Sequence, residues 1–331
     1  MVKIGINGFG RTGRCAMRIG LKNPQVEIKA INSRAENKMM AHLFKYDSTY
    51  GIWPEEVSAN EKEIVVGSRR ISGFNFDDPS KIPWAHAGVD IVIESTGVFT
   101  STEEGMFHVR GGAKKVIISA PTKDETKMVI MGVNEKIINK DDLVISNASC
   151  TTNCLAPVVK VLDENFSVTD GFCTTVHAVT NDQQILDKSH EDYRRARGAM
   201  ESMIPTTTGA AKAIGKIIPK LQGKMDGIAI RIPLATVSLI DLVCLVEKQP
   251  DREKLVNAFK NAEQGTLKGI LATCDKPLVS ADFIGNPKSA IIDLLSLNVI
   301  DKMVKVIAWY DNEWGYSGRL IDLALFLGNL L

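Results

Sequence analysis

The sequence feature that most constrains the fold is a glycine cluster near the N-terminus, Gly8-Phe9-Gly10-Arg11-Thr12-Gly13, which fits the pattern GxGxxG. An apolar strand candidate, 3–7, precedes it, and helical periodicity over 11–22 follows it. In this setting the first glycine permits a tight turn, the second admits a pyrophosphate, and the third lets the helix pack closely on the sheet. The alternative is a glycine-rich turn without a ligand. The context favours a Rossmann-type dinucleotide site that includes Gly8, Gly10, Arg11, Thr12 and Gly13.

Strand and helix candidates alternate over residues 1–149, which predicts a parallel α/β sheet. Residues 61–76 suggest a short antiparallel insertion that turns at Gly67-Ser68. Long strand candidates after Cys150 predict a second sheet that is mixed or antiparallel, and the apolar segment 315–331 predicts a helix that packs back on the first domain. We therefore expect an α/β dinucleotide-binding domain of residues 1–149 plus 313–331 and an α+β domain of residues 150–312.

Composition excludes several classes of protein. A formal net charge of +1 over 331 residues gives no electrostatic reason to expect nucleic acid or an anionic membrane as the main partner. The chain starts directly with a strand candidate, which leaves no room for a signal peptide, and Arg231, Pro233 and Asp241 interrupt its longest apolar tract. The six cysteines are too sparse for a disulfide framework, and Cys150 with Cys154 makes a poor zinc signature. We expect a cytoplasmic protein without a metal site.

The end of the second predicted strand, Asn32-Ser33-Arg34, bears on the choice of dinucleotide. An acidic residue usually binds the adenosine ribose here, but no carboxylate occupies the place. Ser33 can hydrogen-bond a 2′-phosphate and Arg34 can neutralise it, which favours NADP, or use of both cofactors, over strict use of NAD. Alternatively, Arg34 points into solvent and Asn32 alone holds the ribose of NAD.

A chemically reactive loop, Ser149-Cys150-Thr151-Thr152-Asn153-Cys154, lies between a strand candidate at 143–147 and helical periodicity at 155–165. Cys150 should therefore meet helix N-terminal amides, which stabilise a thiolate. Such a thiol suits a nucleophile, or a dinucleotide-binding redox sensor without turnover. Farther along, the Arg-rich segment 181–204 is either a functional or interface loop or a solvated run of charge.

Several motifs in one order give the chain a resemblance to the phosphorylating glyceraldehyde-3-phosphate dehydrogenases. They are the segments 5–11, 45–48, 94–99, 149–154, 204–212 and 309–317. The resemblance implies a cytoplasmic homotetramer of glycolysis that reversibly oxidises D-glyceraldehyde 3-phosphate to 1,3-bisphosphoglycerate with NAD or NADP. It also implies that Cys150 is the nucleophile and His177 its base, that a thiohemiacetal becomes a thioester, and that inorganic phosphate releases the product.

The resemblance also implies binding residues. Thr180 and Arg231 would hold the substrate phosphate, and the attacking phosphate would be bound by Ser149, Thr151, Arg197, Thr208 and Gly209. Arg197 is chosen over Arg194 and Arg195, and Thr208 could equally cap a helix. The cofactor cleft would include Thr96, Gly97 and Ser119, with Asn312 on the nicotinamide carboxamide and Tyr316 nearby.

Two departures from the family pattern concern the cofactor. Ser33 replaces an acidic residue, and Asp77-Asp78-Pro79 lacks the Arg often found before Asp-Pro. A close alternative is erythrose-4-phosphate dehydrogenase, which the resemblance describes as using the same nucleophile and base but water to resolve the thioester. Dependence on phosphate separates the two reactions.

Overall fold

The computed structural model describes all residues, 1–331, and divides into two compact units. The first comprises Met1–Val129, Lys136–Ala148 and Ser317–Leu331, and the second comprises Ile130–Glu135 and Ser149–Tyr316. These bounds differ from the expected ones because the short segment Ile130–Glu135 and residues 313–316 belong to the second unit. No helix of the chain is both long enough and apolar enough to span a membrane.

The first unit contains an eight-stranded sheet in the order β10-β9-β8-β1-β2-β7-β6-β5. Its strands are β1 (Val2–Asn7), β2 (Val26–Asn32), β5 (Val57–Ala59), β6 (Glu63–Val66), β7 (Arg69–Phe74), β8 (Ile91–Glu94), β9 (Lys115–Ile118) and β10 (Val144–Ser146). The strands from β10 to β7 pair in parallel, whereas β5, β6 and β7 pair antiparallel, with Gly67 at φ 58° between β6 and β7. The predicted parallel sheet and antiparallel insertion are both confirmed.

Helices and a small hairpin complete this unit. They are α1 (Arg11–Gly20), α2 (Asn37–Lys45), α3 (Thr102–Arg110), and the paired strands β3 (Tyr46–Asp47) and β4 (Gly51–Ile52). From β1 the sheet continues to β2 on one side and to β8 on the other. In open α/β sheets such a reversal of strand order marks the ligand crevice, at the carboxyl ends of the strands. The loops that begin at Gly8, Ser33, Ser95 and Ser119 all start from that edge.

The second unit has another eight-stranded sheet, in the order β12-β13-β11-β14-β18-β16-β15, with β17 paired to β18. Its strands are β11 (Val168–Ala178), β12 (Ile204–Thr207), β13 (Met225–Ile232), β14 (Ser238–Val246), β15 (Leu271–Cys274), β16 (Ala290–Asp293), β17 (Asn298–Ile300) and β18 (Met303–Tyr310). The pairs β11–β13 and β15–β16 are parallel and the others antiparallel, so the predicted mixed sheet is confirmed.

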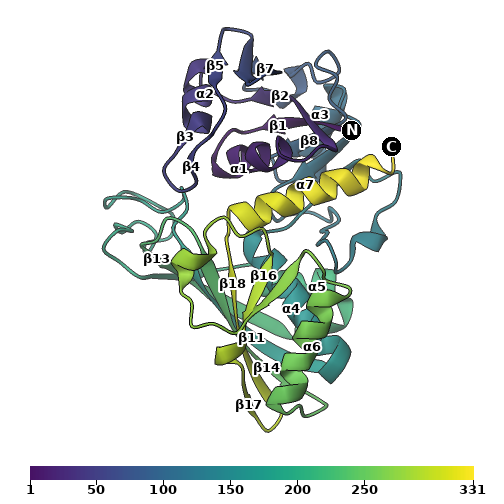
Figure 1. The fold of residues 1–331 in the computed structure, drawn as a ribbon, viewed down its shortest axis with the longest axis vertical. Coiled ribbons are helices and arrows are strands. Elements are labelled where there is room, and N and C mark those ends of the chain that lie inside the picture. Colours follow the sequence, from purple (N-terminus) through teal and green to yellow (C-terminus); the bar gives the residue numbers. More distant parts are fainter. The chain divides into compact units, whose positions relative to one another are not determined.

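Helices cover one face of this second sheet. They are α4 (Cys150–Phe166), α5 (Ala210–Ile217) and α6 (Arg252–Gln264), and Figure 1 shows them together on one side of the strands. Buried residues alternate with more exposed ones along β14 and β18, as expected for strands with one covered face. On the other face lies the short 3₁₀ helix Ser280–Phe283, whose Phe283 ring stacks on Trp309 of β18.

Two helix boundaries matter for the site. Helix α4 begins at Cys150, five residues before the predicted periodicity, because the Ser149 hydroxyl caps it and accepts from the Thr152 N–H at 3.1 Å. The last helix, α7 (Trp314–Gly328), ends in the first unit, where Gly328 lies against Val2. The prediction that the C-terminal helix packs on the first domain is therefore confirmed.

Candidate functional site

The second unit brings Cys150 and His177 together. Cys150 is the first residue of α4 and His177 is a buried residue of β11, and Cys150 Sγ lies 3.4 Å from His177 Nε2. The other ring nitrogen, Nδ1, lies 2.6 Å from the carbonyl oxygen of Ala178. An Nδ1–H that donates to this carbonyl leaves the Nε2 lone pair facing the thiol. The imidazole is thus placed to accept the thiol proton.

Arg231 lies beside this pair because β13 runs parallel to β11 and Arg231 is the register partner of His177. Its Nη1 can only donate, so in the tautomer with the proton on Nδ1 it donates to the Ala178 carbonyl oxygen at 3.2 Å and lies 2.6 Å from Nδ1 without a hydrogen bond to it. The other tautomer of His177 lets Nδ1 accept from Arg231. Its Nε atom is buried and has no hydrogen-bond partner in the protein. A buried donor without an acceptor is costly, so this guanidinium offers a place for an anionic ligand.

The burial of Cys150 and His177 and the nearby charge of Arg231 shift the pKa values of the thiol and the imidazole. Burial raises the pKa of the Cys150 thiol, an effect that the Arg231 charge opposes. Burial and the Arg231 charge together lower the pKa of His177 to about 3. Burial of both groups and the Arg231 charge on the imidazole therefore favour a neutral thiol–imidazole pair, whereas the same Arg231 charge acts in favour of the thiolate.

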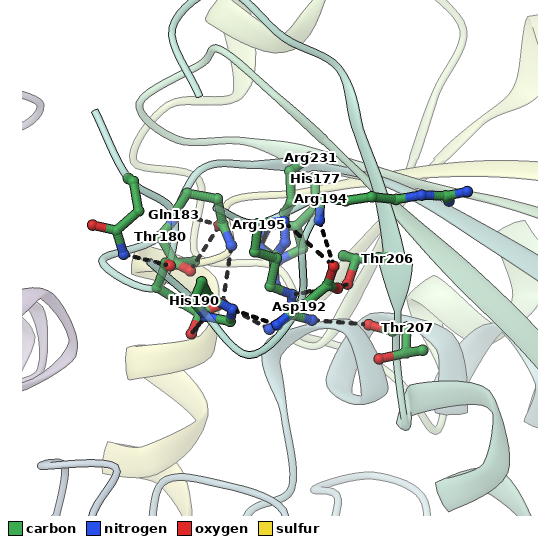
Figure 2. A network of polar contacts seen from close by, with 12 residues as sticks. His177, Thr180, Gln183, His190, Asp192, Arg194, Arg195, Thr206, Thr207 and Arg231 are labelled. Atoms are coloured by element: carbon green, nitrogen blue, oxygen red, sulfur yellow. Dashed lines mark hydrogen bonds and ion pairs between the residues drawn. The ribbon is translucent and has the colours of Figure 1, made fainter. Parts of the chain in front are cut away.

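Among the arginines of the 181–204 segment, Arg195 is the one that contacts the end of β12, just before Thr208. It donates from Nε to Thr206 Oγ1 at 2.8 Å, from Nη1 to Asp182 Oδ2 at 2.6 Å and from Nη2 to the Thr207 carbonyl oxygen at 3.3 Å (Figure 2). Arg194 extends away from this network.

Arg197, the residue chosen from the sequence, is not brought to this group. It pairs with Asp187 at 3.1 Å, and the two side chains are 69% and 66% exposed. The sequence could not separate Arg195 from Arg197, because the two are distinguished only by how the long loop turns.

Thr180 joins the same network through two intervening side chains. Its N–H and hydroxyl donate to Gln183 Oε1 at 3.0 and 3.1 Å, and Gln183 Nε2 donates to Asp182, the carboxylate that also accepts from Arg195. Burial, and to a lesser degree the Arg195 charge, lowers the pKa of Arg231. Arg195 and Asp182 both lie near enough to Arg231 to act on its pKa, and Figure 2 shows Thr180, Arg195 and Arg231 in one group with His177.

The remaining hydroxyls of the loop before and within α4 have partners inside the protein. Thr151 Oγ1 lies 2.8 Å from the Tyr310 hydroxyl, which lies 2.9 Å from Thr175 Oγ1. The Tyr310 ring also meets His177 edge-on, with centroids 6.0 Å apart. Sequence analysis did not single out Tyr310, whose only signal was its position at the end of a predicted strand within the 309–317 motif.

The start of α5 and the 309–317 motif place four more predicted residues in this unit. The Thr208 hydroxyl accepts from the Ala210 N–H at 3.2 Å, as a residue at a helix start does, and Gly209 is the N-cap position. Asn312 is buried, and its Oδ1 accepts from Ser238 Oγ at 2.9 Å. Tyr316 is also buried, which raises the pKa of its hydroxyl.

In the first unit, the glycines of the N-terminal turn fit a bound dinucleotide. Gly8 has φ 91°, and a Cβ there would lie 2.6 Å from the Thr96 nitrogen. A Cβ on Gly13 would lie 2.2 Å from the Gly8 carbonyl oxygen, so only glycine allows α1 to approach the turn. A Cβ on Gly10 would meet nothing within 4 Å, which leaves open space at the N-terminus of α1 for a pyrophosphate.

Side chains near this turn have contacts that the sequence did not reveal. Arg11 forms a two-pronged ion pair with the buried Asp47, at 2.6 and 3.1 Å. The Asn32 amide is used inside the protein, by Asn7 and by both backbone groups of Phe76, which leaves little support for Asn32 as the sole ribose ligand.

The residues expected to select the cofactor are more exposed. Arg34 Nε donates to Asp77 at 2.8 Å, and the two side chains are 84% and 81% exposed. The Ser33 hydroxyl accepts from the Ala35 N–H at 3.3 Å.

The other predicted cofactor residues follow the same edge of the first sheet. Thr96 donates its N–H and its hydroxyl to Glu94, and the Ser119 N–H donates to the Glu94 carbonyl oxygen at 2.9 Å. Gly97 has φ 74° and faces open space. The Thr12 carbonyl oxygen accepts from the Ser317 hydroxyl at 3.3 Å.

Comparison with known proteins gives one consistent result. The family profile described as "Glyceraldehyde 3-phosphate dehydrogenase, NAD binding domain" matches residues 2–102, and the profile of the C-terminal domain of the same family matches residues 149–312. The chain is 53% identical to the glyceraldehyde-3-phosphate dehydrogenase of Geobacillus stearothermophilus, over 99% of this chain and 98% of the relative. It is 50% identical to that of Streptomyces coelicolor, over 100% and 99%. The chain therefore belongs to the glyceraldehyde 3-phosphate dehydrogenase family and uses a nicotinamide dinucleotide.

Proposed function

We propose that this protein oxidises D-glyceraldehyde 3-phosphate with phosphorylation, through a thioester on Cys150. The observation that carries the proposal is the 3.4 Å contact between Cys150 Sγ and His177 Nε2, with the Arg231 guanidinium next to the same imidazole. A nucleophile, a base and a cationic donor at one point suit an aldehyde substrate that bears a phosphate.

The proposed mechanism uses each group in turn. The Cys150 thiol gives its proton to His177 as Sγ attacks the aldehyde carbon, and the imidazolium passes this proton to the carbonyl oxygen, which gives a thiohemiacetal and leaves His177 neutral. The bound nicotinamide supplies the hydride acceptor. His177 removes the hydroxyl proton as the thioester forms, and the α4 N-terminal amide at Cys150 is placed to stabilise the oxyanion. Inorganic phosphate then attacks the thioester carbon, and Cys150 leaves as a thiolate.

Two groups of donors support the two anions that this reaction needs. Arg231, with its unpartnered Nε, and Thr180 suit the phosphate of the substrate. Thr208, Gly209 and Arg195, in place of Arg197, suit the attacking phosphate together with Ser149 and Thr151. Because the Arg231 charge disfavours the imidazolium, an anion bound to Arg231 would make proton acceptance by His177 easier.

The thiol assignment predicts opposite results for two cysteines of the same helix. Cys150→Ser should lower turnover by on the order of 10⁴-fold, since the hydroxyl is a far weaker nucleophile. Cys154 is fully buried and its pKa is raised by burial, so Cys154→Ser should keep most of the activity. Steady-state rates of both purified variants test this, and an active Cys150→Ser enzyme would contradict the assignment.

The phosphate assignment predicts a difference between two neighbouring arginines. Arg195→Gln should raise KM for inorganic phosphate, by roughly 10- to 100-fold for the loss of a charge-assisted hydrogen bond. Arg197→Gln is the matched control from the same loop and should leave this KM within about twofold of wild type, because exposed ion pairs contribute little. Equal effects of the two substitutions, or a larger effect at Arg197, would overturn the choice of Arg195.

We also propose that Ser33 and Arg34 favour NADP, or allow both dinucleotides. The supporting observation is that Arg34 is 84% exposed and held only by an exposed pair with Asp77. Such a pair contributes little to stability, so the guanidinium can exchange Asp77 for a 2′-phosphate.

This cofactor proposal predicts that Arg34→Ala weakens binding of NADP much more than NAD, by roughly 1–3 kcal/mol. Asp77→Asn, which removes a negative charge from the same surface, should instead favour NADP. Dissociation constants for both dinucleotides check this, and equal changes for NAD and NADP in the Arg34 variant would rule out a 2′-phosphate contact.

We further propose that the protein is a homotetramer. The face of the second sheet opposite α4 carries the exposed apolar side chains of Phe172, Leu245 and Met303, which line an apolar groove of about 430 Å³. The 181–204 segment adds Ile185, Leu186 and Tyr193, which are 76%, 77% and 89% exposed. Large exposed apolar patches of this kind mark protein interfaces, and a second copy of the chain is the proposed occupant.

Light scattering tests the assembly, with a four-chain particle expected. Phe172→Glu should shift the population toward smaller particles, because it would bury a carboxylate without a partner in the interface. A monomeric wild-type protein at micromolar concentration would contradict the proposal.

A further inference from the structure

A buried chain of hydrogen bonds lies beneath the dinucleotide turn of the first unit. It links Asn32 of β2, Asn7 of β1, Glu94 of β8, His108 of α3 and the Trp84 indole, all of which are buried. The proposed chemistry uses none of these side chains. At each end of this hydrogen-bond chain lie groups that can act only as donors or only as acceptors. They fix the direction of every hydrogen bond in between.

At one end, the Phe76 backbone fixes the direction. Its N–H donates to Asn32 Oδ1 at 2.9 Å, and its carbonyl oxygen accepts from Asn32 Nδ2 at 3.0 Å. Asn32 Nδ2 must therefore also donate to Asn7 Oδ1, at 2.8 Å. The other end of the Asn7 amide, Nδ2, is then directed as a donor to Glu94 Oε2 at 2.5 Å.

At the other end, Trp84 fixes the tautomer of His108. An indole N–H can only donate, so His108 Nδ1, at 3.1 Å from Trp84 Nε1, is the acceptor. In the neutral ring the proton then lies on Nε2, which donates to Glu94 Oε2 at 2.9 Å. Glu94 thus receives hydrogen bonds from both directions.

The second carboxylate oxygen of Glu94 accepts hydrogen bonds from the turn that follows β8. Oε1 accepts from the Thr96 N–H at 2.7 Å and from the Thr96 hydroxyl. Thr96 in turn lies against Gly8, where a Cβ would come within 2.6 Å of its nitrogen, and the Ser95 hydroxyl donates to the Gly8 carbonyl oxygen at 2.7 Å. Glu94 is therefore the common acceptor of groups that position Gly8, Asn32 and Thr96.

We propose that Glu94 is a positioning residue for the dinucleotide, acting as an ionised acceptor that fixes the ends of β1, β2 and β8 in their binding geometry. This inference rests on the dinucleotide use proposed above. The new element is that a buried charge positions the dinucleotide site. Four donors converge on the Glu94 carboxylate, and an uncharged amide could not accept from all of them.

The test is Glu94→Gln in the full-length protein. Whichever way the new amide turns, its NH₂ group faces donors that cannot reverse, so a buried donor is left unpaired. The dissociation constants of NADH and NADPH, measured by fluorescence titration, should both rise about tenfold, with kcat at saturating dinucleotide little changed. The matched control is Lys115→Met, which removes another buried charge of the same sheet whose bonds go instead to the carbonyl oxygens of Lys140 and Asp142.

The unfolding midpoints of both variants are measured alongside. The inference predicts that Lys115→Met loses stability but binds both dinucleotides as wild type does. It is overturned if Glu94→Gln lowers the unfolding midpoint and still binds them as tightly as wild type, because its role is then purely structural. Wild-type binding in the same titration tests the proposed dinucleotide site itself, so the two failures are distinct.

A second pair of variants serves if Glu94→Gln does not fold. His108→Gln can still donate to Glu94, whereas His108→Leu cannot. The glutamine variant should bind NADH several-fold more tightly than the leucine variant, in line with one buried hydrogen bond. Equal affinities would overturn the proposal.

Discussion

The candidate site of the second unit depends on one constraint of the sheet, which is that β11 and β13 run parallel and in register. This register places His177 and Arg231 side by side, with the Arg231 guanidinium 2.6 Å from the imidazole. Helix α4 starts at Cys150 and delivers its thiol to the other ring nitrogen. A one-residue shift of register would turn one of the two side chains to the opposite face of the sheet and separate base from cation.

The electrostatics of the site follow from this placement. Burial and the adjacent guanidinium both act against the imidazolium, while the same guanidinium partly offsets the cost of burying a thiolate. A buried cation with an unpartnered Nε is costly for an empty site and favourable for one that holds an anion. In the proposed reaction, an anionic substrate bound to Arg231 would link substrate binding to proton transfer at His177.

The dinucleotide turn and the two-sheet architecture could be predicted from sequence because their causes are local. A Cβ on Gly13 would overlap the Gly8 carbonyl oxygen, and the alternation of apolar residues along each strand records which face is covered. The strand-to-helix transition expected at Cys150 is confirmed, although apolar periodicity begins only at Leu155, because it does not register a polar first turn capped by Ser149.

Contacts between distant residues could not be predicted in this way. Arg195 and Arg197 are two positions apart in one charged run, and only the path of the loop decides that Arg195 meets Thr206 while Arg197 meets Asp187. Tyr310 lies 159 residues from Thr151, its hydrogen-bond partner. The hydrogen bonds of Asn32 with Phe76, and those that Glu94 accepts, likewise join residues that are neighbours only in the folded sheet.

The most direct test of the central claim is the rate of glyceraldehyde 3-phosphate oxidation with NAD and with NADP, each in the presence and absence of inorganic phosphate. A thioester on Cys150 that is resolved by bound phosphate predicts turnover that depends on phosphate with either dinucleotide, and a higher kcat/KM for NADP, or similar values for both. Turnover that continues unchanged without phosphate would contradict the account, because water would then resolve the thioester and the proposed site for the attacking phosphate would have no role in the reaction.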